Sequence, residues 1–122
     1  MRYKPITCLI AFILVAACQT TESEKYVADF ESGHLGQALS SAQSRVNQLP
    51  SDISSPRAAI RALRDYGNLG LIYLKLGRRD EAQTAFLRAA KIASEHEVTR
   101  LDEIHASSNL ARFYLSVNQP SV

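Results

Sequence analysis

Apolar residues recur along most of the chain at the three- and four-residue spacing of an α-helix. The first stripe lies between residues 35 and 49 and consists of Leu35, Leu39, Ala42, Val46 and Leu49. These positions share one face of a helix. Similar stripes run through residues 58–76 and 82–93, and no long segment alternates like a β-strand. The chain is therefore predicted to be all-α.

Residues typical of helix ends separate the first stripes. Pro50 follows the first one, and Ser55-Pro56 precedes the second. Serine is a favoured N-cap, and proline suits the first helical position because its missing N–H has no partner there. Gly77 is expected to end the second helix, which the pattern places at residues 58–76.

A last helix is predicted to begin at Thr99, with Asp102 three residues later as in a capping box. Pro120 is expected to end it. Its apolar residues are Leu101, Ile104, Leu110, Ala111, Tyr114 and Leu115.

The N-terminal segment has the layout of an export signal. Arg2 and Lys4 precede residues 6–17, an apolar run of 12 residues. As a helix this run spans roughly 18 Å, too short for a hydrocarbon core of about 30 Å. Residues 1–17 are therefore predicted to be a signal peptide.

The end of this segment, Val15-Ala16-Ala17-Cys18, resembles the lipobox of bacterial lipoproteins. The resemblance implies cleavage before Cys18, diacylglycerol on its sulfur and an N-acyl chain such as palmitate on its amine. Gln19 follows, whereas inner-membrane retention uses Asp there. The implied location is the outer membrane, with the periplasmic face expected. An ordinary signal peptide, or an N-terminal anchor, that happens to hold a cysteine is the alternative.

Composition leaves few chemical activities open. Two of the 14 Lys and Arg residues lie in the signal segment, so 12 basic residues face 12 acidic ones in the rest of the chain. Nothing here favours nucleic acid as a partner. Residues 18–25 are polar after Cys18 and are expected to be a short lipidated tether, whose seven residues after the cysteine reach roughly 25 Å.

A repeat-like pattern occupies residues 66–89. Its spaced landmarks are Leu69, Gly70, Tyr73, Gly77, Ala82, Phe86 and Ala89, and it resembles the tetratricopeptide repeat. The resemblance implies two antiparallel helices that approach closely where Gly70 faces Ala82. A generic antiparallel helical bundle is the alternative.

Partial copies of the pattern lie on both sides. Residues 109–111 with Tyr114 repeat residues 68–70 with Tyr73 at a displacement of 41, and residues 33–38 repeat residues 77–82 at a displacement of 44. We expect a short tetratricopeptide-like antiparallel helix-hairpin solenoid of about four helices over residues 26–118. Residues 119–122 are a C-terminal tail.

No motif for catalysis or metal binding is found. His34, His96 and His105 lack the spacing of a metal-binding motif, and no nucleophile lies in a catalytic context. The expectation is a protein that is not an enzyme and carries no metal and no cofactor beyond the lipid on Cys18.

The resemblance instead implies a concave groove for a peptide or helix of another protein. Counted from the Leu-Gly landmark, the groove residues are Arg64, Gly67, Asn68, Leu71, Leu74 and Lys75, followed by His105, Ser108, Asn109, Arg112 and Leu115. Exposed leucines with basic groups and amides suit a partner segment with apolar and acidic side chains.

These features together predict a non-enzymatic lipoprotein adaptor bound to the outer membrane. Pilotins or assembly factors of pilus and secretion systems are one class that fits. A scaffold subunit in cell-wall synthesis or outer-membrane assembly is the alternative. Self-association or a covering partner is also expected, because a solenoid with so few repeats leaves apolar edges.

Overall fold

The structure is a computed structural model that describes residues 29–118. Four α-helices account for most of this range. They are α3 (Leu35–Asn47), α4 (Pro56–Lys75), α5 (Arg79–Glu95) and α6 (Arg100–Val117). Within residues 29–118 there is no β-strand, and the prediction of an all-α chain is confirmed. None of the helices in this range is long and apolar enough to cross a bilayer.

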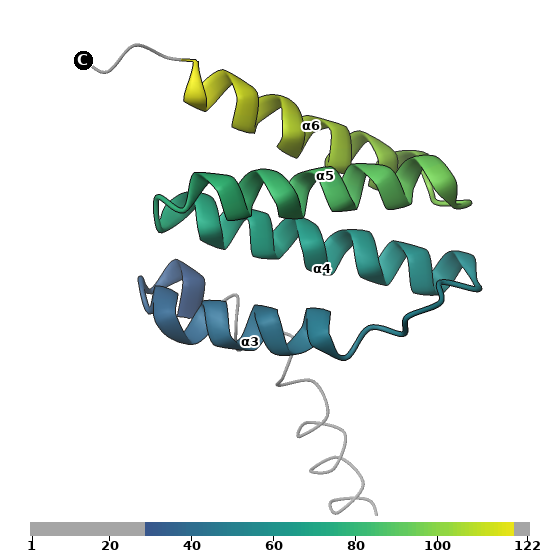
Figure 1. The fold of residues 1–122 in the computed structure, drawn as a ribbon, viewed down its shortest axis with the longest axis horizontal. Coiled ribbons are helices and arrows are strands. Elements are labelled where there is room, and N and C mark those ends of the chain that lie inside the picture. Colours follow the sequence, from purple (N-terminus) through teal and green to yellow (C-terminus); the bar gives the residue numbers. More distant parts are fainter. Residues whose placement is uncertain (1–28, 119–122) are drawn as a thin grey trace, which may run out of the picture.

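Consecutive helices run in opposite directions and stack in chain order, from α3 at one edge to α6 at the other (Figure 1). Helix α4 contacts the three other helices, and α6 packs against both α5 and α4. This is a solenoid of helix hairpins, as the sequence predicts. The predicted signal peptide, Cys18 and tail lie outside the described residues.

Two turns in the chain have the same backbone hydrogen bonds. Gly33 and Gly77 both have positive φ, 82° and 74°. The N–H after each glycine donates to the carbonyl five residues before it, His34 to Asp29 at 2.8 Å and Arg78 to Tyr73 at 2.9 Å. This is the glycine-terminated helix end that left-handed φ permits. The repeat displaced by 44 residues is therefore present in backbone geometry as well as in sequence.

The predicted helix starts at Ser55 and Thr99 are both confirmed. The Ser55 hydroxyl accepts a hydrogen bond from the backbone N–H of Ala58 at 3.2 Å, with Pro56 next to the cap. The Thr99 hydroxyl accepts one from the N–H of Asp102 at 3.2 Å. Each cap satisfies a donor that has no partner inside its helix.

The core consists of two clusters of buried side chains that meet along α4. One joins α3, α4, α5 and α6 around Phe86. The other joins the N-terminal half of α4 to the C-terminal half of α5 through Leu63 and Ile92. Alanines fill much of both clusters, including Ala38 and Ala82, which are fully buried. Small side chains let neighbouring helix axes approach closely.

Helices α4 and α5 approach each other closely at Gly70 in α4. A Cβ placed there would lie 2.6 Å from a ring carbon of Phe86 in α5. Phe86 is 1% exposed, and its ring centroid lies 5.9 Å from that of Phe113 in α6. The missing side chain of Gly70 therefore lets one aromatic ring connect three helices.

The apolar residues of α6 lie on both its buried and its exposed sides. Leu101, Ile104 and Leu115 are 61%, 52% and 66% exposed, whereas Ala106 and Phe113 are buried. Both sides of α6 carry apolar residues, so the spacing alone was consistent with either face. Contact with Phe86 determines which side turns inward.

We expect Gly70→Ala to destabilise the fold by about 1–3 kcal/mol, because the added methyl overlaps the Phe86 ring. Gly36→Ala is the matched control, since a Cβ at Gly36 would meet no atom within 4 Å. Urea unfolding followed by circular dichroism measures both. Equal stability of the two variants would contradict the close packing described here.

Candidate binding groove

A hollow of about 360 Å³ lies between α4 and α6. Its walls come from positions one turn apart on the two helices, so both present a face to the same space. The lining residues are Leu63, Arg64, Gly67, Asn68, Leu71, Leu101, Asp102, His105, Ala106 and Asn109. We call this hollow the α4/α6 groove.

The structure brings most of the predicted groove residues together. Arg64, Asn68 and Leu71 line the groove from α4, and His105 and Asn109 line it from α6. These residues are separated by up to 45 positions in sequence. Their convergence is a consequence of α4 and α6 lying beside each other.

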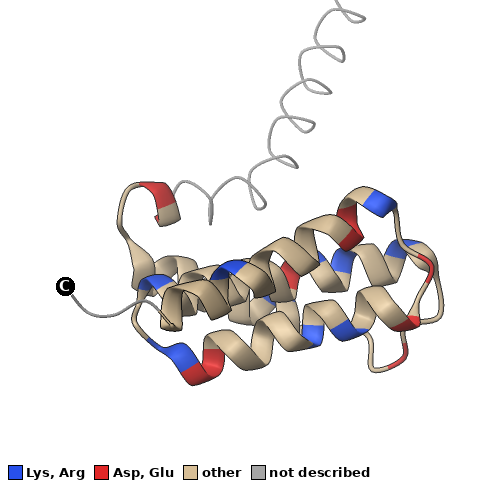
Figure 2. Cartoon of the chain, turned by 90° about the horizontal axis from the view of Figure 1, so that it is seen from above, with Lys and Arg blue, Asp and Glu red and all other residues tan. Residues whose placement is uncertain are grey.

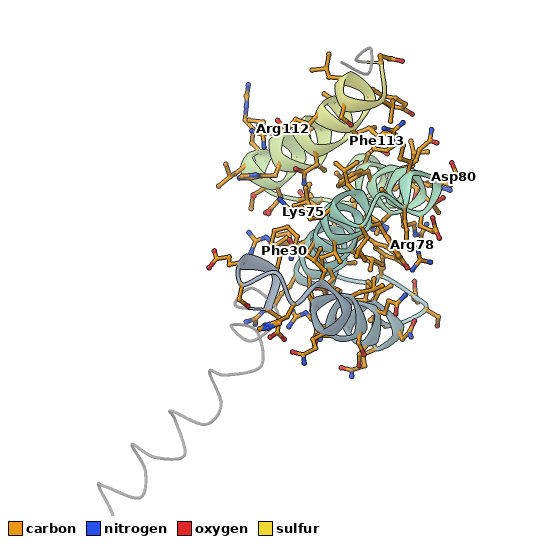
Figure 3. All side chains as sticks on the ribbon, turned by 90° about the vertical axis from the view of Figure 1, so that its left-hand side faces the viewer. Phe30, Lys75, Arg78, Asp80, Arg112 and Phe113 are labelled. Carbon is orange, nitrogen blue, oxygen red and sulfur yellow. The ribbon has the colours of Figure 1, made fainter. Side chains whose placement is uncertain are left out.

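Five other predicted residues, Ser108 among them, lie outside the groove lining. Leu74 is half-buried and packs against the core, and Lys75 is exposed in the last turn of α4. Arg112 and Leu115 are exposed on α6. Figure 3 shows Arg112 on the same side of the molecule as Phe30, away from Asp80 and Arg78. The groove is thus shorter than predicted and covers the N-terminal half of α6.

Sequence reasoning missed four lining residues: Leu63, Leu101, Asp102 and Ala106. Leu101 was named only among the apolar residues of the last helix, although it lies one turn before His105, a spacing that places both on one face. Asp102 was recognised for its cap alone. Its carboxylate also forms an ion pair with Arg64 in the groove wall.

Arg64 and Asp102 form an ion pair that ties α4 to α6. Arg64 Nε donates to Asp102 Oδ1 at 2.7 Å, and the Thr99 hydroxyl donates to Oδ2 at 2.5 Å. The Asp102 side chain is 3% exposed, whereas that of Arg64 is 61% exposed. One carboxylate therefore completes the helix cap and holds the groove wall. It also neutralises the arginine that sequence reasoning assigned to ligand binding.

The pKa of the Asp102 carboxyl is lowered from its usual value. Burial raises this pKa, but hydrogen bonds from Thr99 and Arg64, together with the positive charges of Arg64 and His105, outweigh it. The ionised form is thus stabilised in the folded protein. Stability from this group is present above the ordinary aspartate pKa and is lost as the pH falls through the lowered one.

The groove offers amides above an apolar floor. Asn68 and Asn109 contribute side-chain amides, and a Cβ at Gly67 would lie 3.5 Å from the Asn109 amide nitrogen. Each amide both donates and accepts hydrogen bonds, as backbone peptide groups require. Leucines beside them supply apolar contact. This arrangement suits a polypeptide segment better than a small charged ligand.

The residues that the structure describes contain no cluster of metal-ligating side chains. Among residues 29–118 no three His, Cys, Asp or Glu side chains converge on one point. Lysines and arginines are interspersed with acidic residues over the described surface (Figure 2).

Comparison with protein families identifies the central hairpin. Residues 66–96, which comprise the C-terminal half of α4 and all of α5, match the tetratricopeptide repeat. The described helices therefore form a tetratricopeptide-like domain, as the motif in residues 66–89 predicts. Neither the curated proteins nor the solved structures contain a match to the chain.

We expect Asp102→Asn to destabilise the domain at pH 7 and to flatten its acid-dependent loss of stability. The reason is that a neutral amide has no lowered pKa to titrate and leaves Arg64 without its anion. Urea unfolding at pH 7, 5, 4 and 3 measures the dependence.

Glu81→Gln is the control for this experiment. Glu81 also has a lowered pKa, because of its hydrogen bond from Arg78, but the pair is exposed and lies within one turn of α5. Its removal should alter the pH profile much less. An Asp102→Asn profile parallel to that of the unmodified protein would exclude the buried Asp102 carboxylate as a source of acid sensitivity.

Proposed function

We propose that this protein is a lipid-anchored adaptor of the bacterial cell envelope that binds a peptide or helix of another envelope protein in the α4/α6 groove. The observation that carries the binding part of the proposal is the tetratricopeptide repeat at residues 66–96, next to a groove with polypeptide-binding chemistry. Repeats of this kind are interaction modules, and stacked hairpins use their concave surfaces for binding. No enzymatic family is indicated.

The groove chemistry favours a partner segment of mixed character. Leu71 and Leu101 offer apolar contact, and Asn68 and Asn109 offer hydrogen bonds to a backbone. Arg64 already pairs with Asp102, so the groove does not present a dedicated carboxylate clamp. The partner is then held by its apolar side chains and backbone more than by charge.

The membrane part of the proposal rests on the sequence. Val15-Ala16-Ala17-Cys18 resembles a lipobox, and Gln19 favours the outer membrane. Two or three acyl chains on Cys18 would hold the protein stably, at about 0.8 kcal/mol per buried CH₂. The polar tether would keep the groove near the bilayer, facing partners at the periplasmic side.

Pilotins, which escort a secretion channel subunit to its membrane, combine the anchoring and binding that we propose. A scaffold subunit in a complex for cell-wall synthesis or outer-membrane assembly would use the same two elements. Neighbouring genes for a secretin or a pilus ATPase would favour the first, and wall-synthesis genes the second.

Replacing His105 in the groove with a photoreactive benzophenone amino acid is expected to crosslink an envelope protein in living cells. The same group at Leu87, which is 43% exposed on α5 and outside the groove, is the matched control. Asn109→Ala should reduce the yield at position 105 about fivefold, as the loss of one backbone hydrogen bond predicts. Equal capture at both positions would argue against the groove as the binding site.

Cells fed a radioactive or alkyne-tagged palmitate should label the protein, and Cys18→Ser should abolish the label. Cys8→Ser is the matched control, because Cys8 lies within the predicted signal peptide and should leave labelling intact. Gel fluorography with membrane fractionation measures the outcome. Labelling that survives Cys18→Ser would refute the lipid anchor without affecting the groove.

A further inference from the structure

Helix α6 repeats α4 in sequence but not in burial. At the displacement of 41, Ile104 corresponds to Leu63 and Tyr114 to Tyr73. In α4, Leu63 and Tyr73 are 3% and 9% exposed; in α6, their counterparts Ile104 and Tyr114 are 52% and 40% exposed. Helix α5 packs with Leu63 and Tyr73 in the two core clusters. The described chain has no helix that covers α6 in the way α5 covers α4.

We define the edge stripe as the exposed apolar residues Leu101, Ile104, Ala111 and Leu115 of α6, with the exposed Ser108 between Ile104 and Ala111. At 100° per residue they fall within one side of α6, opposite the buried Phe113. All four are exposed. Helix α6 forms the edge of the solenoid away from α3 (Figure 1), and Figure 2 looks onto this edge.

Arg100 and Arg112 flank the edge stripe on opposite sides, each roughly 60° round the helix from its centre. Both are exposed, and neither has an ion pair among the described residues. Beside the stripe, a hollow of about 500 Å³ is lined by Arg100, Glu103 and Ile104. Glu103 lies about 120° from the stripe centre, so the immediate flanks are basic.

These charges disfavour a second copy of the chain as the occupant. If two α6 helices paired antiparallel about Ser108, residue 104 of one would face residue 112 of the other. Arg112 would then lie next to His105 of the second copy, and no acidic residue would lie on that flank.

We propose that the edge stripe docks an amphipathic helix of a different protein, with acidic residues on both sides of its apolar face, in the position that α5 occupies on α4. The edge stripe borders the α4/α6 groove at Leu101 and continues along the outer side of α6, and its occupation goes beyond the adaptor function proposed above. Acidic flanks pair with Arg100 and Arg112. Ala111 in α6 corresponds to Gly70 in α4, which leaves room for the Phe86 ring. Because Ala111 has a methyl group, the docking helix carries a small residue opposite Ala111.

The test uses two synthetic 18-residue helical peptides with the same leucine and alanine stripe, one flanked by glutamates and the other by lysines. Fluorescence anisotropy measures the binding of each to the full chain extracted in mild detergent. We expect the glutamate peptide to bind at least about tenfold more tightly than the lysine peptide. Arg100→Glu with Arg112→Glu should reverse this preference, and Arg57→Glu, at an exposed arginine of α4, is its matched control.

The apolar contact is tested by Ile104→Ser with Leu115→Ser, which should weaken the glutamate peptide about tenfold. Leu87→Ser on α5 is the matched control, and Asn109→Ala, in the groove, should leave binding unchanged. The proposal is overturned if both peptides bind equally, if neither binds, or if Asn109→Ala abolishes binding. A dimer in sedimentation equilibrium that Leu115→Ser dissociates would likewise overturn it in favour of a second copy.

Discussion

The architecture depends on the close approach of α4 and α5 at Gly70. With no side chain at this position, the Phe86 ring fills the space above the α4 backbone and reaches Phe113 in α6. One ring therefore determines the spacing of the central hairpin and the rotation of the last helix. Interiors pack at the density of organic crystals, so a single extra methyl at such a contact has no free space to enter.

The α4/α6 groove follows from that rotation. Because Phe113 turns inward, Asn109 and His105 face α4, and Asp102 reaches Arg64. The buried carboxylate of Asp102 then caps α6 and crosslinks the two groove walls at once. The positive charge of Arg64 in the groove wall is thus already paired within the fold. Asparagine amides and leucine side chains remain to contact a partner. The site is better suited to a polypeptide than to a charged small molecule.

The same rotation leaves the other side of α6 uncovered. A helix that is apolar on two opposite sides must find two packing partners or expose one of them to water. Helix α4 has packing partners on both sides, because α5 covers the side of α4 that corresponds to the exposed side of α6. The solenoid is thus a surface with two candidate docking regions that share Leu101 at their border.

Local signals in the sequence were sufficient for the helices, their capping residues and the glycine-terminated turns, because Ser55, Thr99 and Gly77 act on backbone groups within a few residues. The hairpin motif also pointed correctly to Gly70 and Phe86, whose roles follow from residue size. The inward face of α6 could not be found in this way, since Leu101 and Phe113 are both apolar and their spacing is compatible with either face. The partner of Arg64 lies 38 residues away, and an ion pair of that range exists only after α4 and α6 are packed side by side. Helix formation is a short-range property of the chain, whereas the choice between two apolar faces is made by competition for contact with the other helices.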